Sequence, residues 1–313
     1  MDVQHNQTIA SEFILLGITD SPELRTPLFV LFLALYALAV TGNILTAAAI
    51  QSDAQLSQSP MYFFLTCLSL VDVGLTSVIA PTMLLSLLGG QGETFISYSG
   101  CLTQLYFFLA LANTDSYLLA AMAVDRYVAI CNPLQYTKVM NHHLCLLLLA
   151  GSCSISHLHS FFQTMLISRL TFAASANRVP HFFCDILPLM KLSCSDTSIT
   201  VALIEALPVI ITPFMCVVIS YVRILATVLK VSSAKGKCKA FSTCGSHLTV
   251  VTLFYGSVIR VYFRPMSSYT AVKDRVVSVV YTILTPMLNP FIYSLRNADL
   301  QGALRKLVCQ RRN

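Results

Sequence analysis

The chain has 313 residues, of which 56% are apolar and 11% are charged, and its mean hydropathy is +0.71. Soluble globular domains carry about 25% charged residues, so this chain has too few charges to cover a surface exposed to water. The net charge of +6 is modest and no basic stripe alternates with aromatic residues, which excludes a nucleic-acid-binding protein. We therefore expect an integral membrane protein that is surrounded by the lipid bilayer.

Seven apolar stretches are long enough to cross a membrane, which takes about 20 mostly apolar residues. Only a helix satisfies its own backbone hydrogen bonds in lipid, so each stretch predicts a transmembrane helix. In chain order they are about Leu28–Ile50, Met61–Leu88, Leu102–Ile130, Leu144–Ile167, Ile199–Leu229, Phe241–Tyr262 and Val276–Tyr293. This pattern predicts an all-α seven-helix bundle that forms a single domain over residues 1–313. Its N-terminal segment would be 1–26, its bundle 27–293 and its tail 294–313.

The basic residues collect on one side of the predicted bundle. That side has twelve basic and three acidic residues, whereas the opposite side has eight of each. Cytoplasmic loops hold the excess of Lys and Arg, so we expect a multi-pass plasma-membrane protein with an extracellular N-terminus and a cytoplasmic C-terminus. The sequon that begins at Asn6 lies on the predicted outer side and predicts glycosylation there.

Three of the eleven cysteines face the predicted outer side: Cys101, Cys184 and Cys194. An odd number allows at most one disulfide among them. Cys101 opens the third span and Cys184 lies in the long connection between the fourth and fifth spans. A bridge between these two would tether the connection over the mouth of the bundle, and we expect this pairing. Three free thiols are the alternative.

The tail that follows the last span has a helical pattern. Leu300, Leu304, Leu307 and Val308 recur at helical spacing, and four basic residues lie elsewhere around the same helix. This pattern predicts a short amphipathic helix on the anionic inner leaflet. A disordered basic tail is the alternative.

Ionisable groups inside a membrane are costly and are therefore candidates for function. Along the third span, Asp115 and Arg126 share one helix face and lie 11 residues apart, which is about 16 Å along the axis. Asp72 lies within the second span, and Asn43 and Asn289 lie within the first and seventh. If these groups converge with Asp115, the two carboxylates repel each other unless a cation or a proton lies between them. We expect a site that responds to Na⁺ or to protons; simple hydrogen bonding between helices is the alternative.

The segment from Met122 to Tyr136 reads MAVDRYVAICNPLQY. It resembles the MAYDRYVAICxPLxY signature of olfactory receptors within the rhodopsin-like class of G-protein-coupled receptors. Further matching segments follow in order along nearly the whole chain: Gly42-Asn43, Pro60–Leu65, Leu68–Asp72, His181–Asp185, Ser220-Tyr221, Lys239–Cys244, Phe254–Gly256 and Pro286–Asn297. The resemblance implies a seven-helix receptor that binds small volatile odorants and activates a stimulatory olfactory-type G protein, which raises cyclic AMP.

The resemblance also implies which residues act. The ligand cavity in the outer half of the bundle would be lined by Phe108, Ala112, Asn113, Glu205, Val209, Tyr255, Val258, Ile259, Tyr262, Val279 and Thr282. Coupling and activation would involve Asp125, Arg126, Tyr127, Tyr221, Lys239, Asn289, Pro290 and Tyr293. By analogy, Arg126 is held by Asp125 at rest and is released on activation. Glu205 would contact a ligand donor; alternatively it pairs with Arg260 or reaches the membrane interface.

The sequence departs from the family pattern in its outer loop. Residues 172–177 lack the cysteine that would pair with Cys194, which puts a second outer disulfide in doubt. The motif from His181 to Asp185 has been interpreted as a metal site in such receptors, but Cys184 is expected in a disulfide, so we expect no metal.

Other classes of protein fit less well. A transporter would often show two repeated halves, and the sequence has no internal repeat. Enzyme motifs such as HExxH or a glycine-rich phosphate loop do not occur in a suitable context, and we expect no enzyme and no cofactor apart from Na⁺ at Asp72 and Asp115. The remaining alternative is a non-olfactory rhodopsin-like receptor for a lipid or a small metabolite.

Overall fold

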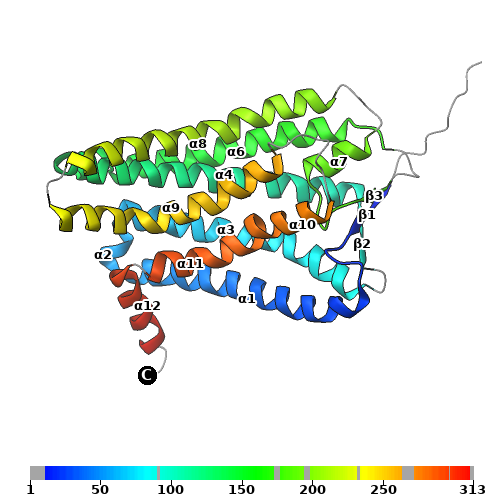
Figure 1. Ribbon diagram of the computed structural model, residues 1–313, viewed down its shortest axis with the longest axis horizontal. Helices are drawn as coiled ribbons and strands as arrows, with labels where there is room; N and C mark the ends of the chain where they lie inside the picture. Colours follow the sequence, from blue (N-terminus) through cyan, green and yellow to red (C-terminus); the bar gives the residue numbers. More distant parts are fainter. Residues whose placement is uncertain are drawn as a thin grey trace, which may run out of the picture.

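The long helices of the protein run side by side (Figure 1). The computed structural model describes residues 11–89, 92–172, 177–193, 198–230, 233–262, 271–295 and 297–310. The long helices are α1 (Pro22–Ser52), α3 (Pro60–Leu88), α4 (Tyr98–Cys131), α6 (His142–Ser168), α8 (Ser198–Lys230), α9 (Ala234–Tyr262) and a composite of α10 (Ala271–Val279), η3 (Val280–Leu284) and α11 (Thr285–Leu295). Within the described residues, six of them are long and apolar enough to cross a membrane, and α9 is the further helix. The predicted all-α seven-helix bundle is confirmed.

The helices extend slightly beyond the predicted spans. Helix α1 begins at Pro22, five residues before the expected start of the bundle at residue 27, because proline is well suited to the first turn of a helix. The last helix continues to Leu295. Short helices connect the long ones: α2 (Ala54–Ser57), η1 (Pro133–Gln135), α5 (Tyr136–Val139) and α7 (Ile186–Leu192).

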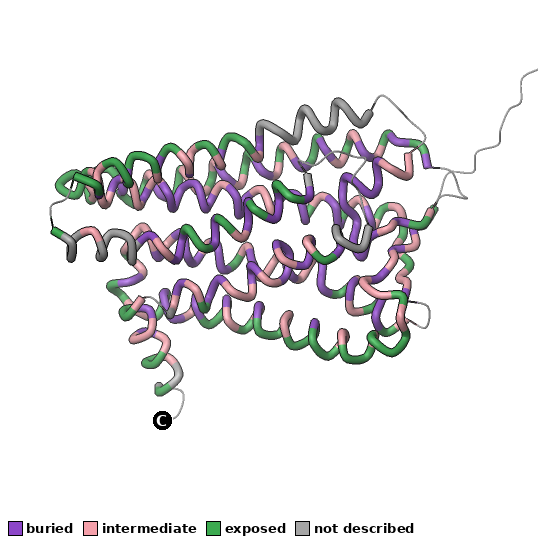
Figure 2. The backbone as a smooth tube through the Cα atoms, viewed as in Figure 1, coloured by how far each residue is buried: buried purple, intermediate pink, exposed green. Residues whose placement is uncertain are grey.

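Helix α4 lies at the centre of the bundle. In the most apolar 18-residue stretch of α4, 67% of the residues are buried. The corresponding fraction is 17% in α1, which lies at the edge of the bundle. Figure 2 shows buried residues concentrated on the inward faces of the helices, and exposed residues along the outer side of α1. Gly42 lets α1 approach α11, because an added Cβ would lie 3.3 Å from Pro290 Cγ. The exposed residues of these outer faces include many large apolar side chains, as expected for helices that contact lipid.

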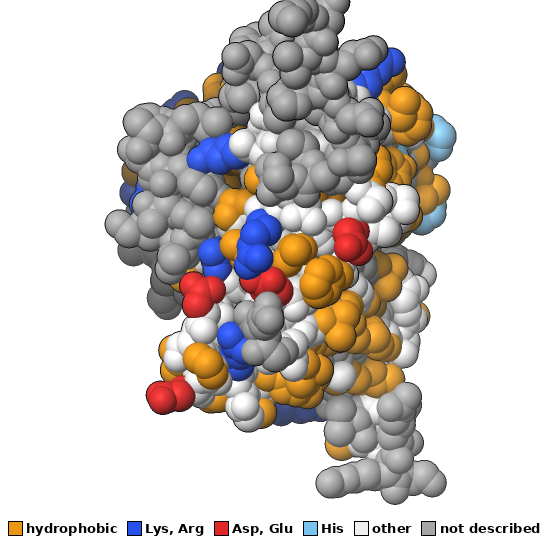
Figure 3. Space-filling view, turned by 90° about the vertical axis from the view of Figure 1, so that its right-hand side faces the viewer, with side chains coloured by type: hydrophobic (Ala, Val, Ile, Leu, Met, Phe, Trp, Pro, Cys, Tyr) orange, Lys and Arg blue, Asp and Glu red, His pale blue; other side chains and the backbone are white. Residues whose placement is uncertain are grey.

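A small sheet covers one end of the bundle. Strand β1 (Glu12–Leu16) pairs antiparallel with β2 (Glu93–Ser97) and parallel with β3 (Arg178–Val179). Phe13 and Leu15 alternate into the core and are 1% and 0% exposed. Figure 3 looks onto this end, where basic and acidic side chains lie next to one another and apolar side chains cover the flank. This sheet was not predicted from the sequence.

The expected disulfide is present. Cys101 and Cys184 are joined at an S–S distance of 2.01 Å, which ties the segment between α6 and α8 to the start of α4. The Cys184 N–H also donates to Gln104 Oε1 at 3.0 Å. Cys194 and the sequon at Asn6 lie outside the described residues.

The tail forms the predicted helix, α12 (Ala298–Gln310). It lies crosswise to the long axis of the bundle (Figure 1). Leu300 is fully buried in the core cluster at the α12 end of the bundle, which we call the inner core. Lys306 Nζ lies 3.3 Å from Asp53 Oδ2. The N–H groups of Gln55 and Leu56 donate to the same Asp53 carboxylate, and these bonds lower its pKa. Contact with a membrane leaflet stays a prediction for α12.

Candidate functional site

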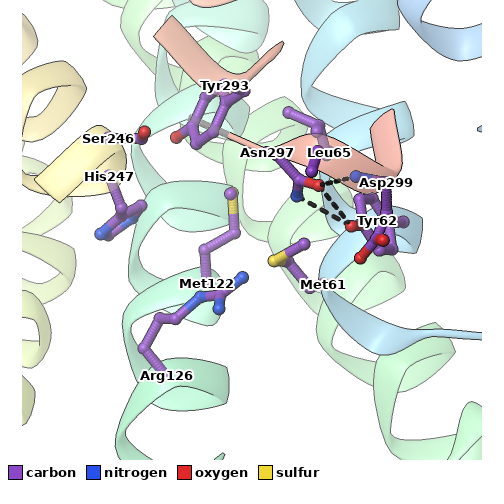
Figure 4. Close-up of a pocket in the computed structure, with 11 residues that line it drawn as sticks. Met61, Tyr62, Leu65, Met122, Arg126, Ser246, His247, Tyr293, Asn297 and Asp299 are labelled. Carbon is purple, nitrogen blue, oxygen red and sulfur yellow. Dashed lines mark hydrogen bonds between the residues drawn. The ribbon is translucent and has the colours of Figure 1, made fainter. Parts of the chain in front are cut away.

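A pocket of about 330 Å³, which we call the inner pocket, lies at the end of the bundle where α4 ends and α12 begins (Figure 4). Four elements line it: α3, α4, α9 and the segment from α11 to α12. The lining residues are Met61, Tyr62, Leu65, Met122, Arg126, Ser246, His247, Tyr293, Asn297, Ala298 and Asp299. Of these, the sequence analysis assigned only Arg126 and Tyr293 to coupling and activation.

Arg126 is the cation that lines this pocket from α4. Its side chain is 13% exposed, and its Nε lies 3.9 Å from Asp125 Oδ2. The Tyr136 hydroxyl donates to the other oxygen of Asp125 at 2.8 Å. Asp125 is therefore shared between the neighbouring guanidinium and a tyrosine of α5, and this sharing fixes the carboxylate beside Arg126.

A buried histidine connects three helices on one side of the pocket. His247 Nε2 lies 3.0 Å from the carbonyl oxygen of Leu119, and its Nδ1 lies 2.7 Å from the Tyr221 hydroxyl. A carbonyl can only accept, so Nε2 carries the proton and Nδ1 accepts from Tyr221. The ring thus joins α9 to α4 and α8 through a single tautomer. His247 was not predicted as a site residue, although a histidine within an apolar helical run was a signal for it.

On the opposite side, α3 is bonded to the junction of α11 and α12. The Tyr62 hydroxyl donates to Asn297 Oδ1 at 3.0 Å, and Asn297 Nδ2 lies 2.8 Å from the same hydroxyl. Asn297 Oδ1 also accepts from the N–H groups of Asp299 and Leu300, so it caps the start of α12. The Tyr293 hydroxyl is buried and has no hydrogen-bond partner among the residues that the structure describes.

A polar layer lies midway along the bundle. It separates the inner core from a second core cluster at the sheet end, which contains Phe13 and Phe108 and which we call the outer core. Asn289 Nδ2 donates to Asp72 Oδ2 at 2.7 Å, and Asp72 interacts electrostatically with Asp115. Asn43 Nδ2 donates to the Pro286 carbonyl, one turn before Asn289. The structure therefore brings together the expected polar groups of α1, α3, α4 and α11. One side-chain oxygen (Oδ1) of each of these four Asn and Asp residues is buried and lacks a donor within the described part of the chain.

Several residues of the expected ligand cavity lie where the outer core meets this polar layer. Phe108 is 2% exposed, and its ring lies 4.9 Å from that of Phe183 and 6.3 Å from that of Tyr281. Tyr255 is buried on α9, and its hydroxyl lies 2.7 Å from the Ser116 hydroxyl of α4. Val209, Val258, Val279 and Thr282 are also buried, and Ala112 packs partly buried against the outer core.

Two residues expected in the ligand cavity face away from it. Ile259 is 43% exposed on the outside of α9, while Val261, two residues further along the helix, is buried in the outer core. Asn113 Nδ2 lies 3.3 Å from His159 Nδ1 and so faces α6. Tyr127, expected to take part in coupling, packs against the cluster of Ile224, Val228 and Cys244 and is not among the residues that line the inner pocket, so its role in coupling stays a prediction. The side chains of Glu205, Tyr262 and Lys239 lie outside the described residues.

The segment that follows β3 uses its His-Cys-Asp motif for structure. His181 is buried, and its Nε2 lies 3.1 Å from the Ser278 hydroxyl of α10. Burial and the nearby Arg275 lower the pKa of His181 to about 3, so the ring is neutral. Cys184 is in the disulfide, and Asp185 accepts from the Ile186 N–H at the start of α7. Each member of the motif thus has a structural contact.

The fold and the inner pocket define a seven-helix membrane receptor. The family model for the olfactory receptor matches residues 32–311. The chain is 58% identical to human olfactory receptor 1L6 over 98% of this chain and 88% of that protein, and 58% identical to human olfactory receptor 1L4 over 98% of both. It is 51% identical to rat olfactory receptor 1f45 over 98% of this chain and 97% of that protein. The chain belongs to the olfactory receptor family, whose members are G-protein-coupled receptors and not enzymes, and it is a multi-pass membrane protein.

Proposed function

We propose that this receptor binds small hydrophobic odorants in the outer half of its bundle and activates a stimulatory olfactory-type G protein, which raises cyclic AMP. The observation that carries the proposal is the position of Arg126 in a pocket at the end of the bundle, in a chain of the olfactory receptor family. A protein partner that inserts a segment into this pocket meets the Arg126 guanidinium, two methionines and Tyr293, whose hydroxyl has no partner among the described residues.

The orientation of the chain is part of the proposal. The end with Arg126 and α12 faces the cytoplasm, because it collects most of the Lys and Arg residues. The end with the sheet and the disulfide faces outward, where thiols are oxidised. Epitope tags at the two termini, stained before and after permeabilisation, test this orientation. Only the N-terminal tag should stain before permeabilisation, and staining of both tags or of neither in that condition would refute the orientation.

The odorant would contact the aromatic and apolar side chains around Phe108. Phe108, Phe183 and Tyr281 form an aromatic cluster. The hydroxyls of Ser116 and Tyr255 would supply polar groups at the deeper end of the site, about 12 Å further along α4. A mostly apolar site with a few polar groups suits a compact hydrophobic molecule. Glu205 would add a carboxylate from α8, so Glu205→Gln should change the response to an odorant panel. An unchanged panel would remove Glu205 from the site.

Activation would release Arg126 from its contact with Asp125. We expect Arg126→Ala to abolish the cyclic AMP response to an odorant that activates the wild type, while surface staining remains. Arg305→Ala is the matched control, because Arg305 is exposed on α12 and lies outside the pocket. A full response from Arg126→Ala would contradict the proposed coupling. A ligand screen with lipids and metabolites in the same cells tests the non-olfactory alternative.

The polar layer would bind Na⁺ or hold a shared proton. The four buried Oδ1 atoms of Asn43, Asp72, Asp115 and Asn289, which accept from no donor among the described residues, fit a hard cation, which prefers oxygen ligands. If Na⁺ binds only the folded receptor, ten times its Kd adds about 1.4 kcal/mol of stability. We expect the purified receptor to melt at a higher temperature in NaCl than in N-methyl-D-glucamine chloride, and Asp115→Asn to remove the difference. Equal melting of the wild type in both salts would exclude Na⁺ and leave a shared proton or helix-to-helix hydrogen bonding as the role of the layer.

A further inference from the structure

A groove of about 770 Å³ runs along the outside of the bundle between α4 and α8. It is separate from the inner pocket and from the residues around Phe108. Its lining residues are Val124, Tyr127, Ile211, Thr212, Met215, Cys216, Ile219, Ser220 and Arg223. On α8 these residues fall in two adjacent rows with a spacing of four, so the groove follows the helix axis.

The groove has an apolar length and a charged end. Ile211, Met215 and Ile219 are 42–55% exposed, so one wall presents aliphatic side chains to the lipid. Arg223 is exposed, and among the described residues no carboxylate forms an ion pair with it. Its side chain lies two to three turns beyond Met215 along α8.

The charged end of the groove is level with the end of α4, where we place the membrane interface. Cys131, the last residue of α4, contacts the Arg223 carbonyl through its sulfur at 3.8 Å and Thr227 Oγ1 at 3.2 Å. Arg223 therefore sits level with the end of the central helix. The distance from Ile211 to Arg223 along α8 is about 18 Å, which is close to half of a hydrocarbon core of about 30 Å plus its interface.

We propose that this groove is a binding site for an anionic phospholipid of the leaflet on the Arg223 side. One acyl chain lies along Ile211, Met215 and Ile219, and the phosphate pairs with the Arg223 guanidinium. A lipid matches the groove in length, in its apolar body and in the position of its charge. Assignment to the cytoplasmic leaflet, which is the anionic one, rests on the orientation proposed above.

A second copy of the chain fits this face less well. Two-fold association about an axis normal to the membrane brings the same surface of both copies together. Arg223 of one copy would then lie at the same depth as Arg223 of the other, with no described carboxylate beside either. A lipid phosphate neutralises this charge, whereas the second copy doubles it.

Photo-crosslinking tests the proposal with the full-length receptor in nanodiscs. One probe is a phosphatidylserine with a diazirine in its acyl chain, and the other is a phosphatidylcholine with the same chain. We expect the serine probe to label the peptide that contains residues 211–219 about five-fold more than the choline probe, which corresponds to about 1 kcal/mol for one basic residue at the surface. Equal labelling by the two probes, or labelling by neither, overturns the proposal.

Two variants locate the interaction. Arg223→Gln should reduce the serine labelling to the choline level, whereas Lys138→Gln, which removes an exposed charge outside the groove, should keep the five-fold excess. Met215→Trp should fill the groove and abolish labelling by both probes. A full excess in Arg223→Gln overturns the proposal. Thermal melting of each variant verifies that it is folded.

The outcome is independent of the proposed function. Both leaflets of a nanodisc carry the probe, and no odorant or G protein is present. A receptor that fails the epitope or cyclic AMP tests can still show the labelling pattern, and a receptor that passes them can lack it.

Discussion

Truncation of Phe13 tests whether the N-terminal strand is a structural part of the receptor. The Phe13 side chain is 1% exposed, and its ring lies 5.2 Å from that of Phe172 and 6.0 Å from that of Tyr98. Replacing a buried phenylalanine by alanine costs about 3–5 kcal/mol. We expect Phe13→Ala to weaken the attachment of β1 by that amount, which raises the detached fraction by about two to nearly four orders of magnitude.

Hydrogen exchange measures this attachment directly. The Ile14 N–H donates to the Asn177 carbonyl and the Gly17 N–H donates to the Gly92 carbonyl, both at 2.9 Å, so these amides are protected while β1 is in place. In Phe13→Ala they should exchange at least a hundred-fold faster. Phe95 is the matched control, because it lies on the neighbouring strand β2 and is 66% exposed. Equal protection in Phe13→Ala and wild type would refute the role given to this strand.

Three further predictions concern the stability of the two ends. In the unfolded chain His181 takes up a proton below its ordinary pKa of 6.5, whereas in the folded protein its pKa is about 3. The free energy of unfolding therefore has its full value above pH 6.5 and falls by about 2 kcal/mol by pH 5. Gly17→Ala should cost about 1–3 kcal/mol, because its Cβ would lie 2.6 Å from the Gly92 carbonyl oxygen. Leu300→Ala should cost about 2–5 kcal/mol by removing a fully buried contact of α12.

Thermal melting of the purified receptor checks all three. His181→Gln should remove the loss of stability between pH 6.5 and 5, and an identical pH profile in this variant would contradict the assignment. Gly151→Ala is the control for Gly17→Ala, because no atom of the described residues lies within 4 Å of its added Cβ. Lys306→Ala is the control for Leu300→Ala. Its ion pair with Asp53 is exposed, so we expect no change, and equal losses in both variants would show that charge holds α12.

The number and order of the helices could be predicted from the sequence because the bilayer restricts the solutions. Each crossing needs a long apolar run, so composition alone separates Leu28–Ile50 from the polar segments around it. The disulfide could be predicted because only three cysteines fall on the predicted outer side, and of these Cys101 and Cys184 are placed to tether the long connection over the mouth of the bundle. The sheet was missed because β1 is only five residues long and pairs with segments about 80 and 165 residues away, and such pairing leaves no local pattern.

The site was harder to predict because spacing defines a helix face but not its direction. Successive residues of a helix turn by about 100°, so a face through Tyr255 and Val258 can include either Ile259 or Val261. Packing against the outer core selects Val261 and leaves Ile259 in contact with the surroundings. The pairing of Tyr62 with Asn297 likewise joins residues 235 positions apart, and neither one signals it alone.

The sheet links the outer ends of helices that an odorant would have to move. Strand β2 continues from α3 into α4, the disulfide holds the segment of β3 to α4, and Arg275 of α10 donates to the Gly17 carbonyl after β1. A shift of α10 against α4 must therefore carry the sheet along or break one of these bonds. The free energy of binding then includes the stability of the sheet. Phe13→Ala lowers that stability without removing a residue of the proposed ligand site, so a changed odorant potency in this variant would measure the coupling.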